Sequence, residues 1–270
     1  MPDELATAID AAQEAGRILR DYFEADYEIH DKGFRNPVTT ADYASNTYLE
    51  ERLRGEFPDF GWLSEETEDT PERLSYDRLW VVDPLDGTKE FIEGVGQFVV
   101  SIGLVEGGAP IMGVLYNPVT EELFAASAGQ GTTYNGEAVQ VSRQENLAEV
   151  EILNSRSETN RGLWEPYAAQ FKALVPIGSV AYKLGLMAAG KHDMFATLRP
   201  KNEWDVCAGH CLLNEAGAEL RSLLDGEVIT YNKEATITRP GLVGGNPQLV
   251  RQFLDLYRGN THQGNQHGHR

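Results

Sequence analysis

The chain of 270 residues carries 42 acidic and 23 basic side chains, which gives a formal net charge of −19. This acidity argues against a nucleic-acid duplex or an anionic membrane surface as a partner, because both are bound through basic patches. The 41% hydrophobic and 24% charged residues are typical of a soluble globular protein, and no apolar run is long enough to span a bilayer.

The first predicted elements are helical. Residues 1–4 are polar and acidic, unlike a secretory signal, so we expect a cytoplasmic protein. The apolar spacing of residues 3–24 predicts an amphipathic helix. A loop over residues 29–37 follows, and residues 39–56 form a second helix that ends before Pro58.

Acidic residues at the ends of the next elements have both a structural and a functional interpretation. Asp42 lies three residues after Thr39, so it either completes a capping box or directs its carboxylate towards a metal site from the helix start. A strand at 61–64 leads to Glu65 and Glu66, which either belong to a solvated acidic loop or supply one metal ligand. The residues alone leave both alternatives open.

The chain is organised around a strand, a turn and a short helix. Residues 79–82 are strand formers, and we expect the strand to end at Asp83 because Pro84 cannot continue a hydrogen-bonded ladder. Asp86 and the glycine after it predict a turn, which leads into a short helix over residues 88–93. Two acidic residues therefore lie between a buried strand and a helix.

Those two acidic residues indicate a cation site. Asp83 and Asp86 would repel each other unless a cation lies between them, and hard oxygen ligands suit magnesium. The backbone N–H groups of Gly87 and Thr88 would start the short helix and offer an anion site beside the metal. Phosphate ester chemistry uses this arrangement. In the alternative interpretation, Asp83 only ends a strand and Asp86 only turns the chain.

The rest of the chain divides into two parts. An antiparallel meander is predicted from strand-like runs at 97–106, 109–116, 121–127, 131–134 and 138–142. The second part alternates strands with helices, which implies layered α/β packing: strands at 150–154, 174–177, 193–197, 218–221 and 241–244, and helices at 161–172, 179–190, 205–216 and 247–257. We expect an N-terminal α+β subdomain over 1–146, a C-terminal α/β subdomain over 147–258 and a disordered tail over 259–270.

The helix predicted at 205–216 carries further reactive side chains. Asp205 either caps this helix or binds a metal. Cys207 and Cys211 lie four residues apart with His210 between them, which is too few ligands for zinc. We expect two buried free thiols, because an unpaired cysteine behaves as a small core residue and a reducing cytoplasm disfavours disulfides.

Several of these stretches resemble motifs of the inositol monophosphatase superfamily. One stretch closely resembles the metal motif of this superfamily, namely Asp83-Pro84-Leu85-Asp86-Gly87-Thr88. Its ending, Thr88-Lys89-Glu90-Phe91, resembles the sequence found in the CysQ-type 3′(2′),5′-bisphosphate nucleotidase branch. The nucleotidase pattern Ser-Pro-Val-Thr-x-Ala-Asp resembles residues 36–42, with Asn36 in place of the serine. Other family motifs resemble Leu63-Ser64-Glu65-Glu66, Gly178-Ser179-Val180-Ala181-Tyr182-Lys183 and Glu203-Trp204-Asp205.

The resemblance implies an α/β fold, a layered αβαβα sandwich with the active site between two subdomains. It also implies two or three magnesium ions, with Glu65, Asp83 and the Leu85 carbonyl at the first and Asp83, Asp86 and Asp205 at the second. Asp42 and Thr88 would orient a water and take its proton. The residues implied to contact the substrate are Glu65, Leu85, Asp86, Gly87, Thr88, Ser179, Lys183 and Asp205. Lys183 has the alternative of an exposed helix lysine.

The function implied is hydrolysis of adenosine 3′,5′-bisphosphate to AMP and phosphate in sulfate assimilation, with inhibition by lithium. The partner would be a small phosphate monoester, and the protein a monomer or homodimer. One alternative is an inositol or sugar monophosphatase with the same metal site. Another is a metal-binding regulatory protein without turnover.

Overall fold

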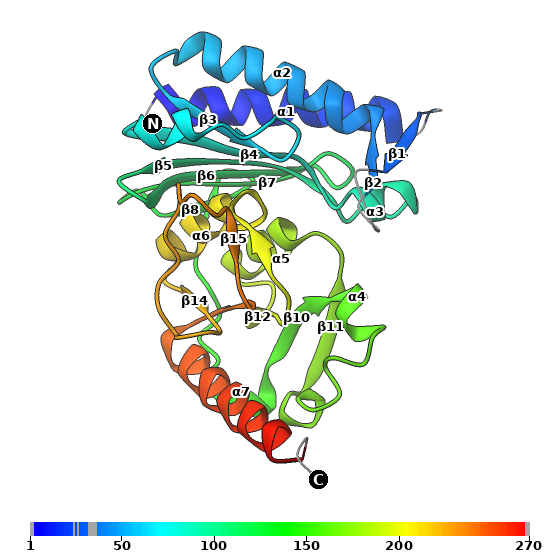
Figure 1. Cartoon of the computed structure of the whole chain (residues 1–270), viewed down its shortest axis with the longest axis vertical. Helices are drawn as coiled ribbons and strands as arrows, with labels where there is room; N and C mark the ends of the chain where they lie inside the picture. The colour runs from blue at the N-terminus through cyan, green and yellow to red at the C-terminus, as the bar shows by residue number, and fades with distance from the viewer. Residues whose placement is uncertain (1–2, 24, 26, 32–36, 268–270) are drawn as a thin grey trace.

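The computed structural model describes residues 3–23, 25, 27–31 and 37–267, arranged in five layers (Figure 1). Helices α1 (Asp3–Phe23) and α2 (Thr40–Glu56) lie side by side over one face of a seven-stranded sheet. Helices α5 (Val180–Ala188) and α6 (Glu203–Ala216) pack on its other face. A five-stranded sheet and helix α7 (Pro247–His267) complete the αβαβα sandwich, which confirms the predicted fold class.

The larger sheet has the order β3-β4-β5-β6-β7-β8-β9. Its strands are β3 (Gly61–Ser64), β4 (Arg78–Asp86), β5 (Val99–Glu106), β6 (Ala109–Asn117), β7 (Glu122–Ser127), β8 (Thr132–Tyr134) and β9 (Glu137–Val139). Strands β3 and β4 are parallel, and every later pair is antiparallel. The predicted meander is therefore confirmed.

The smaller sheet has the order β11-β10-β12-β16-β14. Its strands are β10 (Glu151–Ser155), β11 (Ala173–Ile177), β12 (Met194–Thr197), β14 (Glu219–Ser222) and β16 (Leu242–Gly245). Two strand pairs stand apart from the large sheets: β1 (Ile29–Asp31) with β2 (Pro37–Thr39), and β13 (Lys201–Asn202) with β15 (Ile237–Thr238). Asn36, which replaces the serine of the nucleotidase pattern, lies outside the described residues.

Small residues bring α6 directly against the larger sheet. A Cβ atom on Gly113 would lie 2.2 Å from the carbonyl oxygen of Ala208, and one on Gly103 would lie 2.6 Å from the sulfur of Cys207. Only glycine at these two strand positions allows the helix to approach so closely. The start of α6 is thereby fixed relative to β4. The two cysteines are buried and unpaired, as predicted.

Strand β4 continues past the residue where we expected it to end. The ladder with β5 pairs Asp83 with Ser101 and Asp86 with Val99, and the register shifts between them. Proline is accommodated in a strand at such an irregularity, because no ladder hydrogen bond is needed from it there. The bulge around Pro84 places both aspartates at the end of one strand.

The helix predicted over residues 161–172 is wrong. After α4 (Arg156–Thr159), the chain there forms a series of turns and a single 3₁₀ turn, η3 (Ala168–Gln170). Gly162 has a φ of 72°, and Pro166 has no N–H to donate. Trp164, Tyr167 and Phe171 have the apolar spacing of a helix, but here they pack in an aromatic cluster with Phe253 of α7.

Helix α7 continues to His267, so the tail predicted to be disordered over 259–270 is helical as far as that residue. Residues 249–254 bury an apolar face against the smaller sheet, and once a helix is anchored each further residue adds one backbone hydrogen bond. Residues 268–270 lie outside the description. Among the helices described, none combines the length and the apolar character that crossing a membrane would require.

Candidate active site

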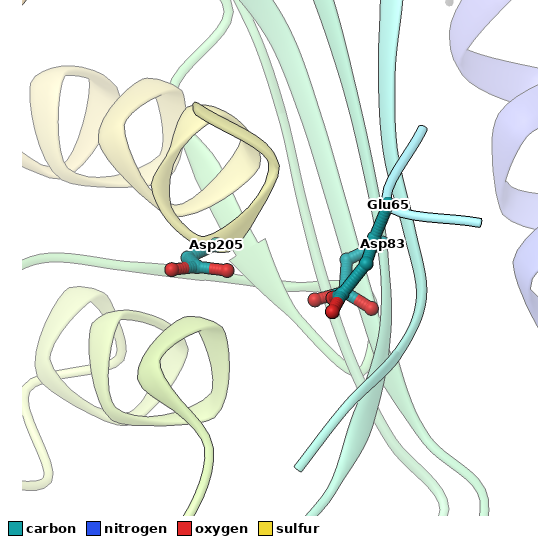
Figure 2. Close-up of side chains that lie close together, drawn as sticks. All are labelled: Glu65, Asp83 and Asp205. Carbon is teal, nitrogen blue, oxygen red and sulfur yellow. The ribbon is translucent and has the colours of Figure 1, made fainter. Parts of the chain in front are cut away.

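Three carboxylates from three different elements converge beside the larger sheet (Figure 2). Glu65 follows β3, Asp83 lies in β4 and Asp205 lies in the first turn of α6. Each offers an oxygen, and these oxygens all lie within 4.8 Å of one another. Glu65 and Asp83 come together because β3 and β4 are parallel neighbours. Asp205 faces them because α6 packs closely against the larger sheet.

The electrostatics of this cluster favour either protons or a cation. Burial and the charges of Glu65, Asp86 and Asp205 raise the pKa of Asp83 well above its usual range. Burial, followed by the charge of Asp86, raises the pKa of Asp205 to about 7. Like charges this close in a desolvated site cannot all stay ionised without compensation. A hard divalent cation would supply it, so the residues present fit a metal of the magnesium class.

Asp86 faces the same cavity but is held by α5. Its Oδ2 atom accepts hydrogen bonds from the Ser179 hydroxyl at 2.5 Å and from the backbone N–H of Ala181 at 2.6 Å. Ser179 has a φ of 52°, a conformation that is unusual for a residue with a side chain. The start of α5 is therefore built around one oxygen of Asp86.

Asp42 completes the capping box, and the functional interpretation is compatible with its second contact. Its Oδ2 accepts hydrogen bonds from the backbone N–H and the hydroxyl of Thr39, which completes the capping box of α2. Its Oδ1 accepts a hydrogen bond of 3.0 Å from the hydroxyl of Thr88. The buried carboxylate therefore both caps its own helix and reaches the residue that lines the cavity after Gly87.

Lys183 is not the exposed helix lysine of the alternative interpretation, since only 2% of it is accessible. Its ammonium donates to the carbonyls of Ile177, Gly178 and Ser179 at 2.9, 3.2 and 2.6 Å. An ammonium has three N–H donors, so all of them are used by the turn before α5. Burial lowers the pKa of Lys183 to about 8, and the charge of Asp86 opposes this change.

These side chains line one open cavity of about 330 Å³. Every predicted site residue except Asp42 lines it: Glu65, Asp83, Leu85, Asp86, Gly87, Thr88, Ser179, Lys183 and Asp205. The cavity is also lined by three cationic residues that the sequence motifs did not single out as site residues, Lys89, Arg156 and Lys201. Arg156 directly follows β10, and a residue at the carboxyl end of a parallel strand is a frequent site position that could have been examined.

Asp205 is the third residue of its helix, not the cap. Helix α6 begins at Glu203 after the cap residue Asn202, and the Oδ2 atom of Asp205 accepts a hydrogen bond of 2.9 Å from the Asn202 backbone N–H. The capping contact holds the carboxylate at the cavity wall. As with Asp42, the structural and functional interpretations are both compatible with the geometry.

The layered fold and the partly buried acidic cluster are those of a metal-dependent phosphatase, and comparison with known proteins supports this class. The inositol monophosphatase family model matches residues 1–257, so the chain belongs to that family. It is 34% identical over 224 residues to inositol monophosphatase 3 of Solanum lycopersicum, covering 79% of this chain and 83% of that one. It is 36% identical over 212 residues to the 3′(2′),5′-bisphosphate nucleotidase CysQ of Salmonella typhimurium, covering 76% and 84%.

Solved structures agree with this assignment. The extragenic suppressor protein suhB of Bartonella henselae superposes with a TM-score of 0.83 at 29% identity, covering 93% of this chain and 97% of that one. An inositol monophosphatase of Thermotoga maritima superposes with a TM-score of 0.84 at 26% identity, covering 97% and 99%. Relatives of both substrate types are similar at comparable identity, so family membership leaves the substrate to be argued from the site.

Proposed function

We propose that this protein is a magnesium-dependent phosphomonoesterase that hydrolyses adenosine 3′,5′-bisphosphate to AMP and phosphate. The observation that carries the proposal is the group of carboxylates of Glu65, Asp83 and Asp205, which lines a cavity that also contains cationic side chains. Carboxylates suit the metal, and the cations suit a second anionic group on the substrate.

Glu65, Asp83, Asp86, Asp205 and the Leu85 carbonyl would hold two or three magnesium ions. When bound, such ions neutralise phosphate oxygens and make a coordinated water more acidic. The protein itself fixes the ligands: the Leu85 N–H donates to the Oδ1 of Asp83 at 3.0 Å, and Ser179 holds Asp86. Preorganised ligands of this kind cost no rearrangement during the reaction.

Thr88 and Asp42 form the route by which a proton leaves the attacking water. The Thr88 hydroxyl donates to Asp42, so its oxygen lone pairs can accept a proton from a water in the cavity. The proton then moves towards the Asp42 carboxylate while the water oxygen attacks phosphorus in line with the leaving ester oxygen. The two hydrogen bonds from Thr39 keep Asp42 in place for this role.

The second phosphate of the substrate is assigned to Arg156 and Lys89. The Lys183 ammonium, which we expected to contact the substrate, has its three donors bound to backbone carbonyls. Arg156 is ion-paired with Glu90 at 3.0 Å and Glu93 at 2.8 Å, contacts that hold its guanidinium at the cavity wall. A planar guanidinium still has further N–H donors for a phosphate.

The main competing function is an inositol or sugar monophosphatase, which the plant relatives favour. In the nucleotidase role the enzyme would act in the cytoplasm in sulfate assimilation, as a monomer or homodimer, and lithium would inhibit it. The discriminating experiment is kcat/KM with magnesium for adenosine 3′,5′-bisphosphate, AMP and inositol 1-phosphate. We expect the bisphosphate to give the highest value. A higher value for inositol 1-phosphate would replace the proposal with its competitor, and no phosphate release from any of the three would favour a regulatory protein.

A further inference from the structure

We propose that Arg73 is a positioning residue that ties the loop after Glu65 to the start of α6, so that Glu65 and Asp205 are held as one unit. The inference rests on the proposed function, because it concerns the spacing of the same two metal ligands. Glu65 opens the loop that leads to η1 (Pro71–Ser75), where Arg73 lies. Asp205 lies in the first turn of α6.

Arg73 is the anchor of an otherwise exposed segment. Residues 68–72, 74 and 75 are all exposed, whereas only 3% of Arg73 is accessible. Its guanidinium binds both oxygens of Asp69, with Nε to Oδ1 at 2.6 Å and Nη2 to Oδ2 at 3.1 Å. This two-point contact fixes the orientation of the guanidinium plane and folds the loop around it.

The remaining donors of Arg73 reach the C-terminal part of the chain. Nη1 donates to the Oδ1 of Asn232 at 2.8 Å, and Nη2 donates to the carbonyl of Lys233 at 2.7 Å. Asn232 returns a hydrogen bond of 3.4 Å from its amide to the Arg73 carbonyl. These contacts join residues that are 159 and 160 positions apart in the sequence.

The same two residues are bound on their other side by α6. Glu203, the first residue of that helix, is buried and accepts hydrogen bonds from the backbone N–H groups of Asn232 at 2.8 Å and Lys233 at 3.1 Å. A continuous set of contacts therefore runs from Arg73 through residues 232–233 to Glu203, two positions before Asp205.

The opposite end of the loop is anchored on α2 instead. Asn46 accepts a hydrogen bond of 2.6 Å from the Ser64 hydroxyl and donates one of 3.1 Å to Thr67. Glu65 is thus held between an anchor on α2 and, through Arg73, an anchor on α6. The Glu65 N–H also donates to the Val82 carbonyl of β4 at 3.2 Å. Loss of Arg73 would keep these contacts but release the far end of the loop from α6, so that the Glu65 side of the cluster could move relative to Asp205.

The test is Mn²⁺ binding to the full chain without substrate, followed by electron paramagnetic resonance of the free ion. Arg73→Ala removes the guanidinium and with it the contacts to Asp69, the Asn232 Oδ1 and the Lys233 carbonyl. Asn232→Gly removes only the side-chain link and tolerates the φ of 59° at that position. The matched control is Arg78→Ala, which breaks ion pairs with Glu4 and Glu106 in another part of the molecule. Thermal unfolding in chelator establishes that each variant is folded.

We expect the dissociation constant for Mn²⁺ to rise about tenfold or more in both bridge variants, the size seen when groups supporting metal ligands are lost. Arg78→Ala should bind Mn²⁺ with the affinity of the wild type. The double variant Arg73→Ala with Asn232→Gly should have nearly the same dissociation constant as Arg73→Ala alone. If Arg73→Ala does not fold, Asn232→Gly decides the matter. Wild-type affinity in folded Arg73→Ala, or in Asn232→Gly where Arg73→Ala does not fold, would overturn the role of Arg73. Absence of Mn²⁺ binding to the wild type would instead overturn the proposed metal site.

Discussion

The hydroxyl of Thr88 donates a hydrogen bond of 3.0 Å to Oδ1 of Asp42, although the two residues are 46 positions apart in the sequence. Asp42 lies in the first turn of a helix on one face of the sheet, and Thr88 follows the bulged end of β4. Their contact joins the acid that caps α2 to the cavity that holds the carboxylate cluster. If this hydrogen bond conducts the proton of the attacking water, its loss should lower kcat strongly.

Replacing Thr88 by valine removes this contact with little change in shape. We expect kcat of Thr88→Val to fall by about a hundredfold or more, the usual contribution of a positioned acid–base group. The measurement is steady-state phosphate release at saturating magnesium. Thr133→Val, which loses a hydroxyl bonded to the Ala125 carbonyl outside the cavity, is the matched control. A Thr88→Val enzyme within twofold of the wild type would remove Thr88 from the proton route.

Lys183 and Arg156 should have different kinetic effects. Lys183→Met breaks the ammonium contacts that shape the turn carrying Ser179, so we expect kcat/KM to fall by a similar factor for every substrate. A hydrogen bond to a charged group contributes about 1.5–3 kcal/mol, or roughly a 10- to 150-fold change. The test compares adenosine 3′,5′-bisphosphate with inositol 1-phosphate. A loss confined to the bisphosphate would restore Lys183 as the second phosphate contact.

Arg156→Gln should instead act selectively. Without the guanidinium, the bisphosphate loses a charged contact that an inositol monophosphate does not use. We expect kcat/KM to fall at least about tenfold for the bisphosphate and much less for inositol 1-phosphate. Arg161→Gln, a change outside the cavity, serves as the control. Equal losses for both substrates with Arg156→Gln would show that its ion pairs with Glu90 and Glu93 serve only the structure.

His210 should make the fold sensitive to acid. Burial lowers its pKa to about 4, and its Nδ1 lies 2.9 Å from the Tyr231 hydroxyl. An unfolded histidine titrates near 6.5, so between these values the unfolded chain binds a proton that the folded chain does not. Stability from this group is therefore complete above the unfolded pKa and is lost as the pH falls from about 6.5 to about 4.

Urea unfolding at pH 7 and pH 5 measures this contribution. The wild type should lose about 2 kcal/mol more between the two pH values than His210→Gln, an order-of-magnitude expectation from the depressed pKa. The comparison with the variant is needed because the raised pKa values of Asp83, Asp86 and Asp205 change stability in the opposite direction. Identical pH dependence in the two proteins would mean that His210 is not held neutral.

The two cysteines should be dispensable for chemistry. Cys207→Ala with Cys211→Ala should keep turnover while lowering stability by about 1 kcal/mol for each buried sulfur removed. Both thiols are buried, and burial raises the pKa of Cys211 to about 12, so neither offers a thiolate at neutral pH. Phosphate release and thermal unfolding are measured on the same preparation. Lost turnover in a folded double variant would contradict this interpretation.

The central carboxylates could be predicted because their signal is local. A run of strand formers, a proline and an Asp-Gly turn specify the end of β4, and only the length of the strand differed from expectation. The helix predicted at 161–172 failed because aromatic residues spaced as in a helix are buried there by a chain of turns.

Contacts that depend on the direction of a side chain or on distant residues could not be predicted from the sequence. Lys183 follows Ser179 at helical spacing, but nothing local indicates that its ammonium turns back onto three carbonyls. Arg156 and Lys201 reach the cavity only because the end of β10 and the strand before α6 come together there with residues that follow β4. Arg73 likewise acquires its role from residues about 160 positions later.

The most direct test of the account is phosphate release from adenosine 3′,5′-bisphosphate with magnesium, with chelator, and by Asp205→Asn. The carboxylate of Asp205 completes the group whose oxygens lie within 4.8 Å of one another. We predict activity that requires magnesium, disappears in chelator, and falls about a hundred- to a thousandfold in a folded Asp205→Asn variant, the range for loss of a preorganised electrostatic contact. Full turnover in chelator, or near-normal turnover by Asp205→Asn, would contradict a metal-dependent phosphatase centred on this cluster.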